Sequence, residues 1–558
     1  MRSVRIIIIF LFLLIAAFLL LLARSFYLQY YKADHYRELS LRQNKKFITF
    51  LPQRGAILDS RIQILAASNK KYIIKAEPRV IKDPRDVAMN LAPLVSMNED
   101  EIYEIITKAS NPGSAKIKVT KDLEECDRVR GIYGIGVDSQ WERYYPAGRL
   151  TSHVVGFVSS DNIGLGGVEL KDDDKLRGRA GRGIFLGDKS RRTIKIEQID
   201  SVLQDGSGIV LTIDSVIQQF VHEELSKRCR EYEAESGVAI VADPKTGAIL
   251  AMVSLPDFDP VDIGVTDANN MRNRGLTDTY EPGSIFKPFA VAAALDAGVI
   301  TRNERIFCED GFYHGKGFGS IKEYDNHRYG DLTIRQILVK SSNIGMAKIG
   351  QKLGKERLYK GLSLFGFGRK TGIELPGEDP GLMWPVGKWT GYSVTRVPYG
   401  QEVTVTAIQV VRAFCVLSNG GHSVQPYLVK AMVDDQGRVV TLKRQPPSVG
   451  YVISPDISKW IVTDALVGVV NDKNDGGTGW RAKLEKWQVY GKTGTANIAR
   501  SDGPGYSEED YVASFVAGAP AEDPRVVVLV SIRKPNKRLG KGYTGGAVAS
   551  PVAGKIIE

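Results

Sequence analysis

The sequence predicts an α+β protein with one N-terminal membrane helix, and three patterns support this prediction. Residues 6–23 are uniformly apolar, and residues 54–204 alternate short apolar strands with helical stretches. Residues 205–558 place β runs at both ends of a mostly helical region, which is typical of an antiparallel sheet flanked by helices with a helical subdomain beside it. We therefore expect an anchor at 1–24, a pedestal at 25–204 and a larger domain at 205–558.

The anchor is the apolar run from Ile6 to Ala23. At about 1.5 Å per residue a helix of this length reaches about 27 Å, close to the ~30 Å hydrocarbon core of a membrane. A cleaved signal peptide has a shorter apolar run, so an uncleaved, single-pass anchor is favoured. Arg2 and Arg5 precede the span and favour a cytoplasmic N-terminus in the inner membrane, with the rest of the chain periplasmic or extracytoplasmic. Residues 25–53 are expected to continue as a helix leaving the membrane.

Composition excludes some classes of protein and leaves others open. The chain has 558 residues, of which 43% are hydrophobic and 25% charged, so neither a disordered chain nor a polytopic membrane protein is expected. Its net charge of +11 fits nucleic acid, an anionic surface or no specific partner. Four widely separated cysteines indicate buried free thiols better than a disulfide framework. They are Cys126, Cys229, Cys308 and Cys415.

The pedestal contains no evident catalytic cluster and is interpreted as a support or interaction module. Its residues 177–195 hold seven basic side chains against one acid, which favours a solvated hairpin over a partner surface. In the larger domain, His314 and His327 together with Cys308 and Asp325 match no standard zinc spacing, so no metal is expected.

The boundary near residue 205 follows from a turn-rich stretch, Asp205 to Gly208, after which β runs begin. Residues 237–242 and 248–254 flank a Pro/Gly turn and predict a hairpin. Residues 511–517 and 525–532 predict a second pair of strands. These four runs are the expected antiparallel sheet.

Ser284 and Lys287 form the first chemical motif, at the start of an apolar helical run. Three residues apart, both side chains lie on one face of a helix, where the lysine amine can take the serine proton. Such a lysine needs a lowered pKa, which burial or a second cation supplies. Alone, the pair is typical of a helix cap with a surface lysine.

Two further motifs follow in order. The first, Ser341-Ser342-Asn343, offers a hydroxyl and a carboxamide. The second, Lys492-Thr493-Gly494-Thr495, follows a short β run and supplies a cation, two hydroxyls and a glycine that lets a substrate backbone approach. Ser-x-x-Lys, Ser-x-Asn and Lys-Thr-Gly in this order are the signature of β-lactamases and penicillin-binding proteins.

With these motifs the sequence resembles a class B penicillin-binding protein, a membrane-anchored peptidoglycan D,D-transpeptidase of the division (septal) type. The pedestal adds three motifs similar to those of the family: Arg54 to Asp59, Arg143 to Phe157, and Gly166 to Glu169. The pedestal departs from the family pattern at Ser60 to Gln63, where family members usually have Arg, followed by Asn or Gly, followed by Gly. The resemblance implies a penicillin-binding, β-lactamase-like fold for residues 205–558.

The resemblance also implies a mechanism without metal or cofactor. Ser284 would attack the D-Ala-D-Ala bond of a stem peptide and form an acyl-enzyme, which an amine acceptor then resolves. Lys287 would accept the serine proton and Ser341, bridged to Lys492, would return one. Asn343 would hold the substrate amide. The terminal carboxylate of the substrate would be bound by Lys492, Thr493 and Thr495, beside Gly494. The oxyanion would be stabilised by the backbone N–H groups of Ser284 and Thr495.

Partners and alternatives follow from the same resemblance. It implies covalent inhibition by β-lactams, docking of the pedestal onto a polytopic glycan polymerase and divisome proteins, and no nucleic-acid partner. Asn343 favours a septal member, since elongation-type members usually have an aspartate there. An elongation-type transpeptidase, a β-lactam sensor or scaffold without transpeptidation, and a β-lactamase are the alternatives.

Overall fold

The computed structural model describes residues 2–36, 39, 45–187, 193–434, 436–442, 450–500 and 503–558. The chain forms two compact units, the first from residues 1–53 and 178–206, the second from residues 54–177 and 207–558. Residues of the expected pedestal therefore enter both units. The boundary at residue 205 stays a prediction.

The first unit contains the apolar helix and a small sheet. Its elements are α1 (Arg2–Phe26), the π-helical turn η1 (Tyr27–Tyr31), β1 (Lys45–Phe50), β6 (Gly181–Gly187) and β7 (Thr193–Ser201). Residues 3–31 make a helix long and apolar enough to cross a membrane, by length and composition. The helix expected up to residue 53 is wrong at residues 45–50, because β-branched and aromatic side chains there favour β1, which pairs antiparallel with β6.

The strands β6 and β7 pair antiparallel, as the predicted hairpin requires. Residues 188–192, which include three of the seven basic residues of the cluster expected at 177–195, lie outside the described residues, so the predicted solvation of the cluster is not tested.

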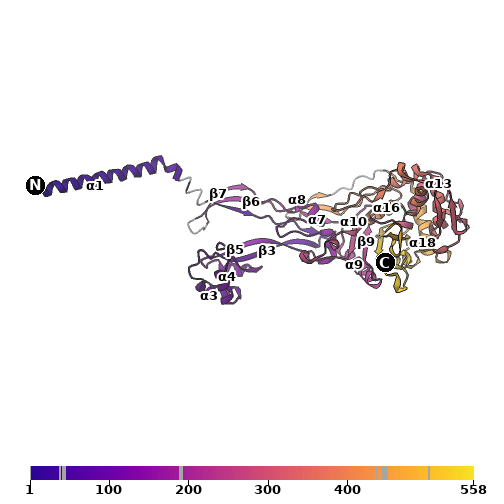
Figure 1. Cartoon of the computed structure of the whole chain (residues 1–558), viewed down its shortest axis with the longest axis horizontal. Helices are drawn as coiled ribbons and strands as arrows, with labels where there is room; N and C mark the ends of the chain where they lie inside the picture. Colours follow the sequence, from indigo (N-terminus) through magenta and orange to yellow (C-terminus); the bar gives the residue numbers. More distant parts are fainter. Residues whose placement is uncertain are drawn as a thin grey trace. The chain divides into compact units, whose positions relative to one another are not determined.

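The second unit begins with a seven-stranded sheet that joins early and late parts of the chain. Six of its strands follow the order β18-β17-β8-β2-β3-β4, and β5 pairs with β3. Figure 1 shows α3 and α4 beside the long β3–β5 pair. The bounds here are β2 (Ile57–Leu58), β3 (Ile64–Ala76), α3 (Pro84–Val95), α4 (Glu99–Thr107), β4 (Ala115–Thr120), α5 (Leu123–Val129), β5 (Ile135–Tyr144), α6 (Ser152–Val155), α7 (Gly167–Lys171), α8 (Asp173–Leu176), β8 (Gly208–Leu211), β17 (Val429–Val433) and β18 (Val439–Leu442).

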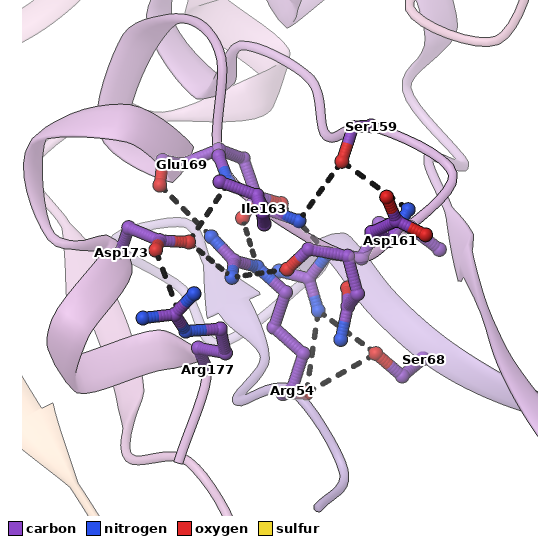
Figure 2. Close-up of polar contacts among 11 residues, drawn as sticks. Arg54, Ser68, Ser159, Asp161, Ile163, Glu169, Asp173 and Arg177 are labelled. Carbon is purple, nitrogen blue, oxygen red and sulfur yellow. Dashed lines mark hydrogen bonds and ion pairs between the residues drawn. The ribbon is translucent and has the colours of Figure 1, made fainter. Parts of the chain in front are cut away.

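A buried ion cluster joins the three family-like motifs of this region (Figure 2). The Arg54 guanidinium donates from Nε to Glu169 Oε2 at 2.6 Å and from Nη1 to Asp173 Oδ1 at 2.6 Å. Arg143 Nε donates to the other Glu169 oxygen, Oε1, at 2.6 Å. Arg54 and Glu169 side chains have 0% exposure and Arg143 has 2%. One carboxylate therefore pairs with two buried guanidinium groups from distant parts of the chain, and Asp173 supplies the second negative charge.

The turn that departs from the family pattern is shaped by Asp59. Its Oδ1 accepts from the backbone N–H groups of Arg61 and Gln63, at 2.8 Å each. Ile62 takes a left-handed conformation with φ +66°, which is unfavourable for a β-branched residue. The turn keeps its shape through the carboxylate at the cost of local strain.

The central sheet has the expected antiparallel architecture, in the order β10-β9-β21-β20-β19. Its strands are β9 (Ser236–Ala242), β10 (Ile249–Leu255), β19 (Tyr490–Ala499), β20 (Tyr506–Ala519) and β21 (Val526–Arg533). Every residue of β9 is buried because the sheet is covered on both faces: Val238 and Ile240 belong to one core, Ala239 and Val241 to the other. The predicted α+β fold is confirmed.

Helices fill the rest of the second unit. The main ones are α9 (Ser215–Glu231), α10 (Arg274–Thr277), the 3-10 turn η5 (Gly283–Phe286), α11 (Lys287–Asp296), α12 (Ile334–Val339), α13 (Asn343–Leu353), α14 (Lys355–Leu364), α15 (Gly391–Arg396), α16 (Ala407–Ser418), α17 (Pro455–Trp460), α18 (Val467–Asn471), α19 (Gly545–Val548) and α20 (Ser550–Ile557), with the short strands β12 (Phe312–Gly315), β13 (Gly319–Lys322) and β14 (Asp331–Thr333). Helix α11 is apolar on all sides and lies inside the core, so its first residues are held rigidly.

Candidate active site

Ser284 lies in the short turn that leads directly into α11. The turn η5 contains Ser284, and Lys287 is the first residue of α11. Gly283 has φ +55°, and a Cβ on Gly400 would lie 2.2 Å from the Gly283 carbonyl oxygen, so glycine at both positions permits this close packing. Ser284 is half-buried and faces a cavity.

Lys287 is completely buried and its amine contacts the Ser-x-Asn motif. Nζ donates to Ser341 O at 2.5 Å, to Ser341 Oγ at 3.1 Å and to Asn343 Oδ1 at 2.8 Å. Burial lowers the pKa of Lys287 to about 7, and the charge of Glu323 opposes this fall. Within the described part of the chain no hydrogen bond joins Lys287 to Ser284. The amine loses one N–H when it is neutral, and its free lone pair can then accept a proton.

Ser341 lies between the two lysines of the site. Its Oγ accepts from Lys287 Nζ at 3.1 Å and from Lys492 Nζ at 2.9 Å. A hydroxyl has two acceptor lone pairs and one proton to donate. Because two amines occupy the acceptor positions, the Ser341 proton is available to a group in the cavity. Ser341 has φ +61°, a strained conformation that turns the chain sharply before α13.

Lys492 is also completely buried, on strand β19. Burial, and second the positive charge of Lys287, hold the pKa of Lys492 well below its ordinary value. Two lysines that share one hydroxyl in a dry environment resist being charged together, so the pair titrates as a unit. Lys492 is thus the nearby second lysine that the sequence argument considered, while burial is what lowers the pKa of Lys287.

The remaining motif residues on β19 point to two sides of the strand. Thr493 and Thr495 line the cavity; Thr493 Oγ1 lies 2.6 Å from Thr478 Oγ1, and Thr495 Oγ1 accepts from Gly545 N at 3.1 Å. Gly494 points the other way. A Cβ there would lie 2.7 Å from the side chain of Ile285, so this glycine admits the Ser284 turn, whereas the sequence interpretation had it admit a substrate backbone.

The cavity has a volume of about 380 Å³. Five of the nine motif residues line it: Ser284, Ser341, Asn343, Thr493 and Thr495. The buried Lys287 and Lys492 lie behind this lining and reach it through Ser341. Strand β19 is an edge strand of the central sheet, so one side of its backbone has no strand partner among the described residues.

Two carboxylates of the cavity lining received no role from the sequence. Glu323 accepts from Ser342 Oγ at 2.5 Å and from Asn343 N at 2.7 Å, and no local pattern marked it. Glu281 directly precedes the Ser284 turn and accepts from Tyr506 Oη at 2.9 Å. Burial raises the pKa of Glu281.

The alternative metal site is not assembled in the described residues, which contain no cluster of three or more His, Cys, Asp or Glu side chains suited to a metal. His314 Nδ1 instead lies 2.9 Å from Ser320 Oγ. All four cysteines are free thiols; Cys229 is half-buried and the other three are buried.

Comparison with protein families assigns both halves of the chain. Residues 237–558 match the penicillin-binding protein transpeptidase domain, and residues 49–211 match the penicillin-binding protein dimerisation domain. The chain belongs to the class B penicillin-binding proteins. The family expected from the sequence motifs is thereby confirmed.

Relatives of this penicillin-binding protein agree in length and architecture. Stage V sporulation protein D of Bacillus subtilis is 34% identical over 98% of this chain and 83% of its own. The peptidoglycan D,D-transpeptidase FtsI of Escherichia coli K12 is 31% identical over 90% of this chain and 82% of its own. The crystal structure of penicillin-binding protein 3 of Mycobacterium tuberculosis with aztreonam has a TM-score of 0.70, with 26% identity over 91% of this chain and 96% of that one.

Proposed function

We propose that this protein is a serine D,D-transpeptidase that crosslinks peptidoglycan stem peptides through an acyl-enzyme on Ser284. The observation that carries the proposal is the arrangement of two buried lysines that donate to one hydroxyl, Ser341 Oγ, beside the cavity that Ser284 faces. The family and the names of its relatives support the reaction class.

In the first half-reaction, Ser284 Oγ forms a bond to the carbonyl carbon between the two terminal D-alanines while Lys287 takes its proton. The C–N bond to the last D-alanine then breaks, and the leaving amine takes the Ser341 proton. A lysine amine replaces that proton on Ser341. In the second half, an acceptor amine attacks the ester, the C–O bond to Ser284 breaks, and protons return along the same groups.

Substrate binding is assigned to the cavity wall. An extended stem peptide can pair with the free edge of β19, which brings its terminal carboxylate to Thr493 and Thr495 near the buried amine of Lys492. Asn343 holds the substrate amide from the opposite wall. The backbone N–H groups of Ser284 and Thr495 stabilise the oxyanion, a contribution of roughly 3–4 kcal/mol per donor in other enzymes.

The cellular role proposed is septal wall synthesis, with α1 as a single membrane anchor. Arg2 and Arg5 orient the N-terminus to the cytoplasm, which places the catalytic region outside the inner membrane. A polytopic glycan polymerase and divisome proteins are the proposed partners. The relatives named for sporulation and division support a septal over an elongation role.

β-Lactams are proposed as covalent inhibitors that acylate Ser284 and stay there. The related Mycobacterium tuberculosis structure holds aztreonam, which supports this assignment. A β-lactamase would release the drug, and a sensor would bind it without transferring substrate.

These outcomes separate in one experiment on the full chain in detergent. It is incubated with a fluorescent penicillin, and separately with a thioester stem-peptide analogue plus a D-amino acid acceptor. We expect a stable fluorescent adduct and transfer of the acyl group to the acceptor. Rapid turnover of the penicillin would identify a β-lactamase, and stable labelling without transfer would identify a sensor.

Depletion of the protein in cells tests the septal role. It is expected to give filaments, and round cells would contradict the septal role.

The rate of acylation is expected to rise with pH through the titration of the lysine pair. Lys287 accepts a proton only when neutral, and its pKa is about 7, so the rate should increase about tenfold from pH 6 to pH 8 and then level off. The charged group that acts on Lys287 is Glu323, which favours the charged form, and the charge of Lys287 in turn lowers the pKa of Lys492. Stopped-flow measurement of penicillin acylation from pH 5 to pH 9 tests this, and a flat profile would contradict it.

A further inference from the structure

Glu323 is a buried carboxylate next to the site that the mechanism above does not use. It lies directly after β13, with 5% of its surface exposed. Three donors converge on it: Ser342 Oγ and Ile344 N on Oε1, at 2.5 and 3.3 Å, and Asn343 N on Oε2, at 2.7 Å. Because every partner donates, the group is an ionised acceptor. The N-terminus of α13, whose first N–H groups have no acceptor within the helix and whose dipole end is positive, favours this charge.

These contacts fix the start of α13 residue by residue. Ser342 uses its hydroxyl twice, since it donates to Glu323 and accepts from Gly345 N at 3.0 Å as the cap of α13. Asn343 Nδ2 donates to Lys322 O at 3.1 Å, so its Oδ1 is turned toward Lys287.

The strained turn at Ser341 is therefore held from its C-terminal side. Ser341 has φ +61°, and the hydroxyl of the next residue, Ser342, donates to the carboxylate of Glu323. A strained backbone conformation persists only where surrounding contacts determine it. Without the carboxylate, three donors at the helix start would lose their acceptor, and the turn could relax and move Ser341 Oγ away from the two amines.

Glu323 also places a negative charge close to the lysine pair. Within the described residues no ion pair of 4.0 Å or less joins it to Lys287, so it acts through space and opposes the effect of burial on the pKa of Lys287. The other titratable groups that its charge affects are Tyr329 and Cys308, both neutral near pH 7 because burial raises their pKa values, to about 12 and about 11.

We propose that Glu323 is a positioning residue for acylation. Its carboxylate holds the Ser341–Asn343 turn in contact with Lys287 and Lys492, and its negative charge opposes the loss of a proton from Lys287. The proposal rests on the acylation of Ser284 proposed above. It adds a fourth segment, between β13 and β14, to the three sequence motifs.

The test is the pH profile of acylation by a fluorescent penicillin in four variants of the full chain. Glu323→Gln removes the charge and keeps the size, so Lys287 should lose its proton more readily. We expect the midpoint of the profile to move to lower pH by about one unit, and the plateau rate to fall at least about tenfold. Glu323→Asp keeps the charge, so the midpoint should stay while the plateau falls. Ser342→Ala keeps the charge and removes one donor, with the same expectation as Glu323→Asp.

Glu378→Gln is the matched control. Glu378 is also buried, with 8% exposure, and accepts from Thr371 N, Thr371 Oγ1 and Gly372 N, away from the cavity lining. The Glu378→Gln substitution should change neither the midpoint of the pH profile nor the plateau rate of acylation. A Glu323→Gln profile equal to that of the wild type, or the same shift in Glu378→Gln, would overturn the proposal. If Glu323→Gln does not fold, Ser342→Ala decides, and an unchanged plateau overturns it. Failure of the proposed function differs, since the wild type would then resist acylation, turn the penicillin over rapidly, or become labelled without transferring an acyl group to the acceptor.

Discussion

Ser284→Ala is expected to leave the protein folded and to abolish its covalent labelling by penicillin. Alanine offers no nucleophilic oxygen, and loss of the nucleophilic serine in serine hydrolases costs at least about 10³-fold in rate. The Ser284 side chain forms no hydrogen bond with other described residues, so its removal leaves no buried group unpaired. Gel fluorescence and intact-mass spectrometry measure the adduct, and thermal unfolding measures the fold. A persistent adduct on the variant would contradict the assignment of the nucleophile.

Ser341→Ala provides the comparison. It keeps Ser284 and Lys287 but removes the hydroxyl to which both lysines donate. Labelling should still occur, at a rate lower by about 10²–10⁴-fold, because the leaving amine loses its proton donor. The two variants therefore distinguish the nucleophile from the proton relay. A variant that forms no adduct has lost the nucleophile, and a variant that forms the adduct slowly has lost the proton relay.

Glu169→Gln is expected to lower the free energy of unfolding of the second unit by about 3–5 kcal/mol. The substitution removes the carboxylate charge that pairs with both Arg54 and Arg143, whose side chains have 0% and 2% exposure, and leaves these two buried cations with one anion, Asp173. Asp173 still contacts Arg54 but does not reach Arg143 in the described contacts. Urea unfolding followed by tryptophan fluorescence measures the change.

The control for this prediction is Glu142→Gln, one residue before Arg143. Glu142 pairs with Lys71 and Lys121 at the surface, with 39% of its side chain exposed. An exposed ion pair contributes about 0–1 kcal/mol, so this variant should unfold almost as the wild type does. Equal losses in the two variants would contradict the role assigned to the buried cluster. Labelling per folded molecule should stay unchanged in both.

Much of the fold could be predicted from local pattern. The uninterrupted apolar run up to Ala23 predicted a membrane-length helix, and the β runs expected at 237–242 and 525–532 correspond to the strands found at 236–242 and 526–533. The three chemical motifs could be recognised in the sequence because each is a short run of neighbouring residues. The prediction failed at residues 45–50, where pairing with β6, a strand more than 130 residues away in sequence, decides the strand.

The sequence by itself determined the family, the membrane-length apolar helix, the β runs at both ends of the larger domain and the identity of the motif residues. Only the tertiary structure decided that Ser341 Oγ receives both Lys287 and Lys492, that Gly494 admits the Ser284 turn, and that Glu323 fixes the start of α13. The physical reason is that these contacts join segments far apart in the chain. Burial, which lowers the pKa of Lys287 to about 7, is likewise a property of everything packed around the amine and not of its neighbours in sequence.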